Sequence, residues 1–132
     1  MTVSVHQTSA SASEATIRGH RVTIDRPVEK GGTDEGPMGG ELFLAAIEGC
    51  FMNNLLTAIK TREARVTEVH TEVVGTAEGT PPRFSGVELG ISADCEDREL
   101  LQKLVEIAER GCIMVNTLRG ALSLSVRIVS RV

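Results

Sequence analysis

Three cysteines, Cys50, Cys95 and Cys112, are the residues of this 132-residue chain whose type could carry chemistry. No two of them are spaced as Cys-x-x-Cys and the three histidines are isolated, so we expect neither a metal site nor any other cofactor. An odd number of cysteines without a visible signal peptide also argues against a structural disulfide framework. For each thiol, burial as a small hydrophobic side chain and thiol chemistry remain open interpretations, and burial is the common case.

Cys50 falls in the middle of residues 41–62, which are predicted to form a helix. The segment is apolar nearly all round, which is typical of a buried helix rather than a surface one. Glu48 is the exception, and a buried acid is costly unless it is paired, for which an arginine is the natural partner. Such an arginine would also lower the pKa of a nearby cysteine. Glu48 could equally be a solvated residue on a narrow exposed stripe.

Cys112 follows a second predicted helix, residues 97–111, whose apolar side chains keep the 3.6-residue period. Asp94 or Asp97 could cap its start, and Gly111 is a plausible end. If Cys112 lies close to Cys50, it would let an oxidised Cys50 form a disulfide instead of over-oxidising, and the alternative is a core cysteine. Cys95 sits at an acidic strand end and is interpreted as a bystander.

The remaining segments must position these thiols. Alternating patterns predict a strand over residues 16–24 with an irregularity at Gly19, a hairpin of strands over residues 66–74 and 84–93, and a final strand over residues 122–128. Residues 29–40 are rich in glycine and predict a long, shaped loop that is functional or mobile. Strands and two helices without regular βαβ alternation favour an α+β fold over a parallel sheet, and we expect one domain over residues 1–132.

Composition excludes several classes of function. The net charge is −4, and three Phe with no Tyr or Trp leave little for stacking on bases, so we expect no nucleic-acid partner. No apolar run approaches the ~20 residues that a membrane span requires, and without a signal peptide the expected location is the cytoplasm. A core built almost entirely from aliphatic side chains is thin, and oligomerisation is a plausible way to bury more surface.

Three motifs resemble those of the OsmC/Ohr family, the osmotically inducible and organic hydroperoxide resistance proteins, over about residues 16–130. The segment ELFLAAIEGC, residues 41–50, is similar to the family's Glu-Leu-Leu-Leu-Ala-Ala-Leu-x-x-Cys helix. AERGC at residues 108–112, followed by VNTL at 115–118, is similar to its Ala-x-x-x-Cys-x-Val-x-x-x-Leu pattern. RGH at residues 18–20, through GGTDEGP at 31–37, is typical of its OsmC-like branch.

The resemblance implies an OsmC-like α+β fold with antiparallel sheets packed around two long central helices, in an intertwined homodimer with sites at the interface. It also implies a thiol peroxidase for organic hydroperoxides. Cys50 would be the peroxidatic residue that becomes a sulfenic acid, Cys112 would close a disulfide with it, and a small or protein dithiol would reduce the pair. Arg18 is the best candidate for the family's assisting arginine, with Arg21 and Arg26 behind it.

One departure bears on activity. The hydroperoxide-reductase branch begins this helix with Asn-Pro-Glu-Gln-Leu or Asn-Pro-Glu-Glu-Leu, and its first acid is functional, whereas Gly40 occupies that acid's place here. Glu48 is a candidate replacement, although positions i and i+2 of a helix point apart. The alternative function is therefore a non-catalytic or redox-sensing protein of the same fold that binds a small apolar ligand at the dimer interface.

Overall fold

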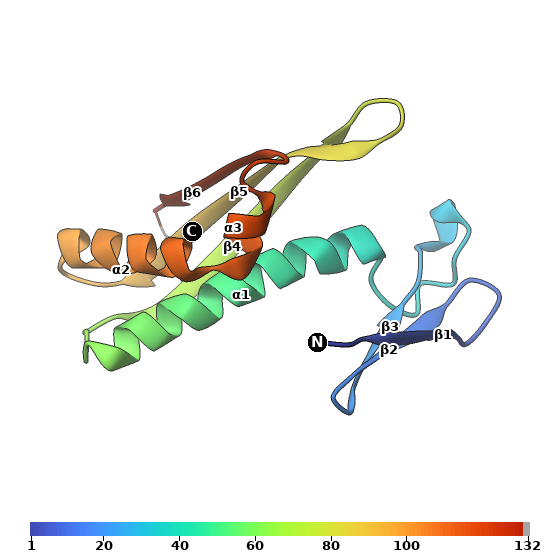
Figure 1. Cartoon of the computed structure of the whole chain (residues 1–132), viewed down its shortest axis with the longest axis horizontal. Coiled ribbons are helices and arrows are strands. Elements are labelled where there is room, and N and C mark those ends of the chain that lie inside the picture. Colours follow the sequence, from blue (N-terminus) through green and yellow to red (C-terminus); the bar gives the residue numbers. More distant parts are fainter. Residues whose placement is uncertain (131–132) are drawn as a thin grey trace. The chain divides into compact units, whose positions relative to one another are not determined.

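The computed structural model describes residues 1–130, which form two compact units, one over residues 1–43 and one over residues 44–130 (Figure 1). The expected α+β class is confirmed, with two three-stranded sheets and helices among these residues. The first unit contains strands β1 (Ser4–Gln7), β2 (Ser13–Ile17) and β3 (His20–Ile24) and the short 3-10 helix η1 (Val28–Lys30). Helix α1 (Gly39–Thr61) begins in the first unit and continues into the second, which also contains β4 (Thr67–Glu78), β5 (Arg83–Asp94), α2 (Arg98–Gly111), α3 (Ile113–Leu118) and β6 (Ser123–Ile128).

The first sheet is an antiparallel meander in which β2 pairs with both β1 and β3. The expectation of one strand over residues 16–24 with an irregularity at Gly19 was wrong. Ile17 pairs with His20, and Arg18 and Gly19 form a tight turn with φ values of 51° and 90°. A two-residue hairpin turn of type I′ requires positive φ at both central residues, which glycine adopts without strain. A glycine inside an alternating pattern therefore marked a chain reversal.

The loop after β3 is organised around Asp25, which is buried. Its carboxylate accepts hydrogen bonds from the backbone N–H groups of Arg26 (2.7 Å), Thr33 (3.2 Å) and Glu35 (3.2 Å), and from the Thr33 hydroxyl (2.8 Å). These bonds, above all the one from Arg26, hold the pKa of Asp25 well below its usual range, although burial acts in the opposite direction. A Cβ on Gly32 would lie 1.9 Å from the Arg26 carbonyl oxygen, so this close approach requires glycine.

The second sheet has the order β4–β5–β6 and is mixed. β4 and β5 form the predicted antiparallel hairpin, but β4 extends to Glu78, beyond the expected end of the strand at residue 74. β6 runs parallel to β5, with Gly86 opposite Ser123 and Ile91 opposite Ile128. The expectation of antiparallel sheets is therefore wrong for this strand. A parallel neighbour requires a crossover connection, which α2 and α3 supply between β5 and β6.

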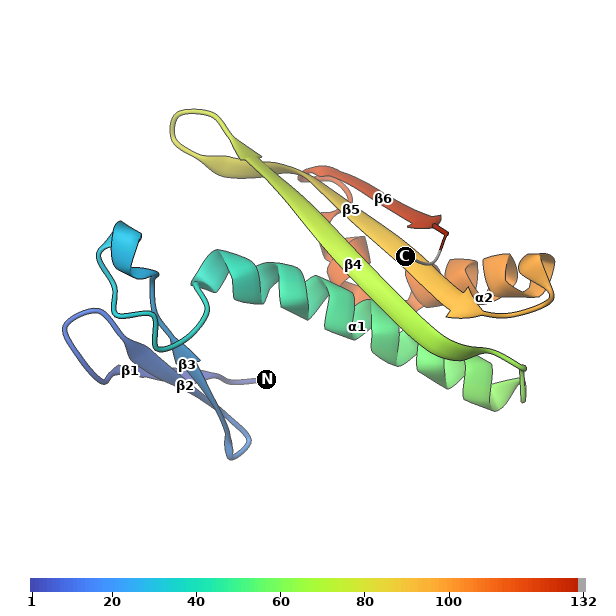
Figure 2. The same ribbon diagram turned by 180° about the vertical axis from the view of Figure 1, so that it is seen from behind.

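The core of the second unit lies between this sheet and the helices on one of its faces (Figure 2). It is aliphatic, as the composition indicated, with Phe51 as a fully buried aromatic side chain. Its largest fully buried members come from α1, β5, α2 and the segment that follows α2: Ile47, Phe51, Leu55, Val87, Leu89, Ile91, Leu101, Leu104, Val105, Cys112 and Val115. This layer holds the α1 segment containing Cys50 and the end of α2 in one packed body.

Helix α1 is buried along one face rather than all round. Ile47, Phe51, Leu55 and Ala58 are buried, whereas Leu56 is 48% exposed within the single chain. The expectation of a buried helix is therefore confirmed for one face of α1 within the single chain, and for the rest of its surface it stays a prediction. An apolar helix leaves part of its surface uncovered when only one sheet and one helix pack against it.

The expectation about the length of the apolar run in α1 needs correction. Its length and apolar composition are by themselves sufficient for a helix that crosses a membrane, although no segment was expected to reach that length. A helix that packs in the core of a globular protein meets the same criterion. The buried face of Ile47, Phe51 and Leu55 shows that α1 belongs to such a core here.

Candidate active site

Two free cysteines meet between the helices of the second unit. The Sγ atoms of Cys50 and Cys112 are 3.4 Å apart, and the Cys112 thiol donates a hydrogen bond to Cys50. Cys50 lies on α1, and Cys112 occupies the break between α2 and α3. The two residues are 62 positions apart, so the sequence by itself could not establish that they are close in space.

The two thiols differ in exposure and in electrostatics. Cys112 is completely buried, whereas Cys50 is half-buried. Burial raises the pKa of the Cys112 thiol because the thiolate would lose its hydration, and the neighbouring Cys50 raises it further. Cys112 is consequently held as a protonated donor at neutral pH, while Cys50 is the sulfur that a solute reaches first.

Helices α2 and α3 set the position of Cys112. The Asp97 carboxylate accepts the Leu100 N–H at 3.0 Å and caps the start of α2, which ends at Gly111 as predicted. Helix α3 was not foreseen, because a six-residue segment is too short to show a clear helical period. A salt bridge between Glu109 and Arg119, with 2.6 Å between nitrogen and oxygen, joins the last turn of α2 to the end of α3.

Glu48 is a half-buried acid on α1. It precedes Cys50 by two residues, which places the two side chains about 200° apart around an ideal helix axis. Its Oε1 atom is buried and has no hydrogen-bond partner among the described residues, so the expected arginine does not pair with this oxygen within them. The role of Glu48 in catalysis stays a prediction.

Arg18 lies in the β2–β3 turn of the first unit, where it is exposed and has a positive φ. Its assignment as the assisting arginine stays a prediction. Gly40 lies in the first turn of α1, and the neighbouring Glu41 accepts the Met38 N–H at 2.9 Å. The carboxylate of Glu41 therefore satisfies a backbone donor at the start of the helix.

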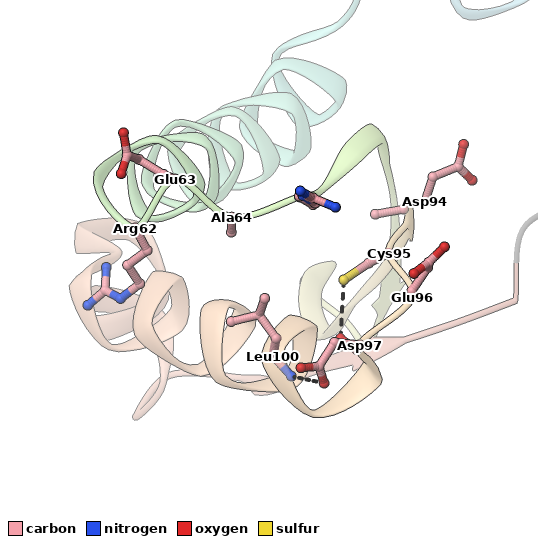
Figure 3. Close-up of a pocket in the computed structure, with 10 residues that line it drawn as sticks. Arg62, Glu63, Ala64, Asp94, Cys95, Glu96, Asp97 and Leu100 are labelled. Carbon is pink, nitrogen blue, oxygen red and sulfur yellow. Dashed lines mark hydrogen bonds between the residues drawn. The ribbon is translucent and has the colours of Figure 1, made fainter.

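Cys95 lines a separate cavity of about 840 Å³ in the second unit (Figure 3). Its thiol donates a hydrogen bond to the Asp97 carbonyl at 3.1 Å. Charged residues surround it: Arg62, Glu63, Arg65, Asp94, Glu96 and Asp97. The described lining residues contain no second cysteine, and residues 1–130 contain no group of three or more His, Cys, Asp or Glu side chains that could hold a metal ion.

Comparison with known proteins identifies a family. The family model described as OsmC-like protein matches residues 32–127, which include both Cys50 and Cys112. A search of curated protein sequences finds no significant match.

Solved structures share this fold over nearly the whole chain. A putative osmotic stress induced and detoxification response protein from Psychrobacter arcticus has a TM-score of 0.85 at 18% identity, covering 98% of this chain and 96% of that one. An organic hydroperoxide resistance protein from Legionella pneumophila has a TM-score of 0.76 at 21% identity, covering 98% and 96%. The organic hydroperoxide resistance protein OhrB of Bacillus subtilis has a TM-score of 0.71 at 21% identity, covering 97% and 96%. At these identities the likeness establishes the fold.

Proposed function

Because the chain belongs to the OsmC-like protein family, we propose that it is a thiol-dependent peroxidase that reduces organic hydroperoxides through Cys50 and Cys112. The observation that carries this proposal is the pair of free thiols with their sulfurs 3.4 Å apart. The organic hydroperoxide resistance proteins among the solved structures with this fold support the choice of substrate.

In the first step, the Cys50 thiolate attacks the terminal oxygen of the hydroperoxide. An S–O bond forms, the O–O bond breaks, and the alkoxide leaves with a proton as the alcohol. Cys50 is oxidised to a sulfenic acid and the hydroperoxide is reduced. The half-buried position of Cys50, beside a completely buried Cys112, supports this assignment of roles.

In the second step, the Cys112 sulfur attacks the sulfenic sulfur of Cys50. An S–S bond forms, the S–O bond breaks, and hydroxide leaves as water with the proton from the Cys112 thiol. Each of the two sulfurs is then part of one disulfide. An external dithiol reduces it by thiol–disulfide exchange, becomes a disulfide itself and returns both cysteines to thiols.

We assign Arg18 as the residue that stabilises the thiolate and Glu48 as an acid that completes the site, within a homodimer. The exposed apolar part of α1 and the buried, unpartnered Oε1 of Glu48 support a second copy of the chain as the cover of this helix. A buried carboxylate oxygen without a partner is costly, so a donor from outside the described residues would relieve it. Sedimentation of the protein at micromolar concentration tests the dimer, and a strict monomer contradicts it.

Counting free thiols tests the peroxidase directly. The reduced protein contains three thiols. Stoichiometric cumene hydroperoxide should remove two of them rapidly and leave Cys95, and hydrogen peroxide should act more slowly. The Cys50→Ser variant is the control and should lose none. If Cys50 does not react at low excess of the organic hydroperoxide, the peroxidase is refuted.

A redox-sensing protein that binds a small apolar ligand is the second candidate, and Gly40 in place of the family's acid favours it. A sensor forms the same disulfide but does not reduce hydroperoxide repeatedly. Multiple turnovers with cumene hydroperoxide and dihydrolipoate as the dithiol support the enzyme. A single oxidation that dithiols reverse only slowly supports the sensor.

A further inference from the structure

The end of α2, immediately before Cys112, is held by donors from two other helices. The last four carbonyl groups of a helix have no intrahelical donor. Here the Ala108 carbonyl accepts Asn54 Nδ2 at 3.4 Å, and the Arg110 carbonyl accepts Asn116 Nδ2 at 2.9 Å. Asn54 belongs to α1 and Asn116 to α3, so each amide joins a different helix to the end of α2.

Asn54 also connects the two cysteines. It lies four residues after Cys50, and residues i and i+4 share one face of a helix. A Cβ added to Gly111 would lie 3.5 Å from Asn54 Nδ2, so this amide lies against the backbone of the residue that precedes Cys112. One side chain therefore links the helix that carries Cys50 to the backbone that carries Cys112.

The backbone at Cys112 needs such support because it is not helical. Cys112 has φ −80° and ψ 111°, an extended conformation between two helices. Its N–H donates to the Glu109 carbonyl at 3.3 Å, and its carbonyl accepts the Asn116 N–H at 2.9 Å. The position of the buried thiol relative to Cys50 thus depends on how the end of α2 is attached to α1.

We propose that Asn54 is a positioning residue for disulfide formation: its amide holds the end of α2 against α1 and keeps Cys112 Sγ within reach of Cys50 Sγ. This inference rests on the redox role that the proposed function gives to the two cysteines. Asn54 takes no part in bond making or breaking. It raises the effective concentration of one sulfur at the other, which is how pre-organised groups accelerate intramolecular reactions.

The chemistry of the contact defines the variants. Asn54→Asp has nearly the same shape but has no N–H to donate to the Ala108 carbonyl, whereas Asn54→Gln retains the donor on a longer side chain. Asn53→Asp is the matched control, because Asn53 is an exposed asparagine one residue earlier on the same helix. All variants are made in a Cys95→Ser background so that two thiols remain.

Equilibration of each protein in a glutathione redox buffer measures the effective concentration of the two thiols without any peroxide. Asn54→Asp should lower it roughly tenfold or more, Asn54→Gln should recover most of the loss, and Asn53→Asp should match the parent. If Asn54→Asp closes the disulfide as readily as the parent, or if Asn53→Asp is impaired equally, the inference is overturned. Failure of Asn54→Gln to recover what Asn54→Asp loses also overturns it, because the amide donor would then not be the cause.

A second measurement separates this inference from the proposed peroxidase. Trapping of the Cys50 sulfenic acid with dimedone after cumene hydroperoxide should be as fast in Asn54→Leu, a neutral variant of similar size that also lacks the donor, as in the parent. The trapped fraction should rise because closure is slower. An equally slowed first step would overturn the positioning role. If the parent does not react with the hydroperoxide but the glutathione measurement still singles out Asn54→Asp, the peroxidase fails and the positioning role stands.

Discussion

The second unit contains two thiol environments that differ in what each sulfur meets. The sulfur of Cys50 lies 3.4 Å from the sulfur of Cys112, which is buried and donates a hydrogen bond to it. Cys95 lines a cavity of about 840 Å³, but its thiol donates to a backbone carbonyl. A large cavity with a cysteine in its wall is therefore not sufficient for disulfide chemistry. The difference is the partner sulfur, which the packing of α1 against the end of α2 supplies.

The largest loss of hydroperoxide turnover is expected when Cys50 is replaced. Cys50→Ser should reduce cumene hydroperoxide turnover with a dithiol by at least ~10³-fold, because a serine hydroxyl is a far weaker nucleophile than a thiolate. A coupled assay that follows hydroperoxide consumption measures this loss. Substantial turnover in Cys50→Ser would move the reactive sulfur elsewhere, with Cys95 as the next candidate.

Removal of the second sulfur should make Cys50 resemble Cys95, which has no second sulfur among the residues that line its cavity. Cys112→Ser should keep the first oxidation but reduce steady turnover by about 10²-fold, because the sulfenic acid cannot form the internal disulfide. Excess peroxide should then convert Cys50 to the sulfinic or sulfonic acid, which intact mass spectrometry detects. A variant that resists over-oxidation as well as the parent would show that Cys112 does not protect Cys50.

The raised pKa of Cys112 predicts a pH dependence of disulfide closure. Burial favours the protonated thiol, so the reactive thiolate fraction grows as the pH rises toward this raised pKa. Closure should accelerate about tenfold per pH unit across the neutral range. Stopped-flow measurement of the second thiol's loss, after a saturating pulse of hydroperoxide, gives this profile. A rate independent of pH would mean that Cys112 is already ionised.

Arg18 should affect the first oxidation and leave closure unchanged. Arg18→Ala should slow sulfenic acid formation by roughly tenfold, because a nearby guanidinium favours the thiolate. Arg21→Ala, in the same hairpin, is the matched control, and Arg21 pairs with Glu14 at 3.9 Å. If the two variants behave alike, Arg18 has no special role at Cys50.

The smallest effect on hydroperoxide turnover is expected from substitution of Cys95. Cys95→Ser should change hydroperoxide turnover by less than about twofold, because the Cys95 thiol takes no part in the proposed steps. The same coupled assay applies, with Cys50→Ser as the comparison. A marked loss of activity would mean that the cavity around Cys95 belongs to the catalytic cycle.

Local patterns predicted the elements that carry the thiols. The amphipathic period predicted a helix over residues 97–111, and α2 spans Arg98–Gly111 with Asp97 as its cap. The apolar run predicted a helix over residues 41–62, and α1 spans Gly39–Thr61. These predictions succeed because helix formation depends on residues within a turn or two and on caps at fixed offsets.

Predictions that depended on distant partners failed. The direction of β6 could not be read from its alternation, because a period of two is the same in parallel and antiparallel strands. The Arg18–Gly19 turn, a local feature, was missed for another reason, because two adjacent strands of five residues each resemble one longer alternating strand. The Asn54 contact with the end of α2 has no local signal at all, since it joins residues 54 positions apart.

The sequence by itself determined that the chain is an α+β member of the OsmC-like family with an aliphatic core, one thiol within a helix and a second thiol directly after another helix. Only the tertiary structure decided that Cys50 and Cys112 meet, that Cys112 is the buried one, and that Asn54 joins their two backbones. Local propensities act over a few residues, whereas the distance between two sulfurs 62 positions apart depends on how whole helices pack against a sheet.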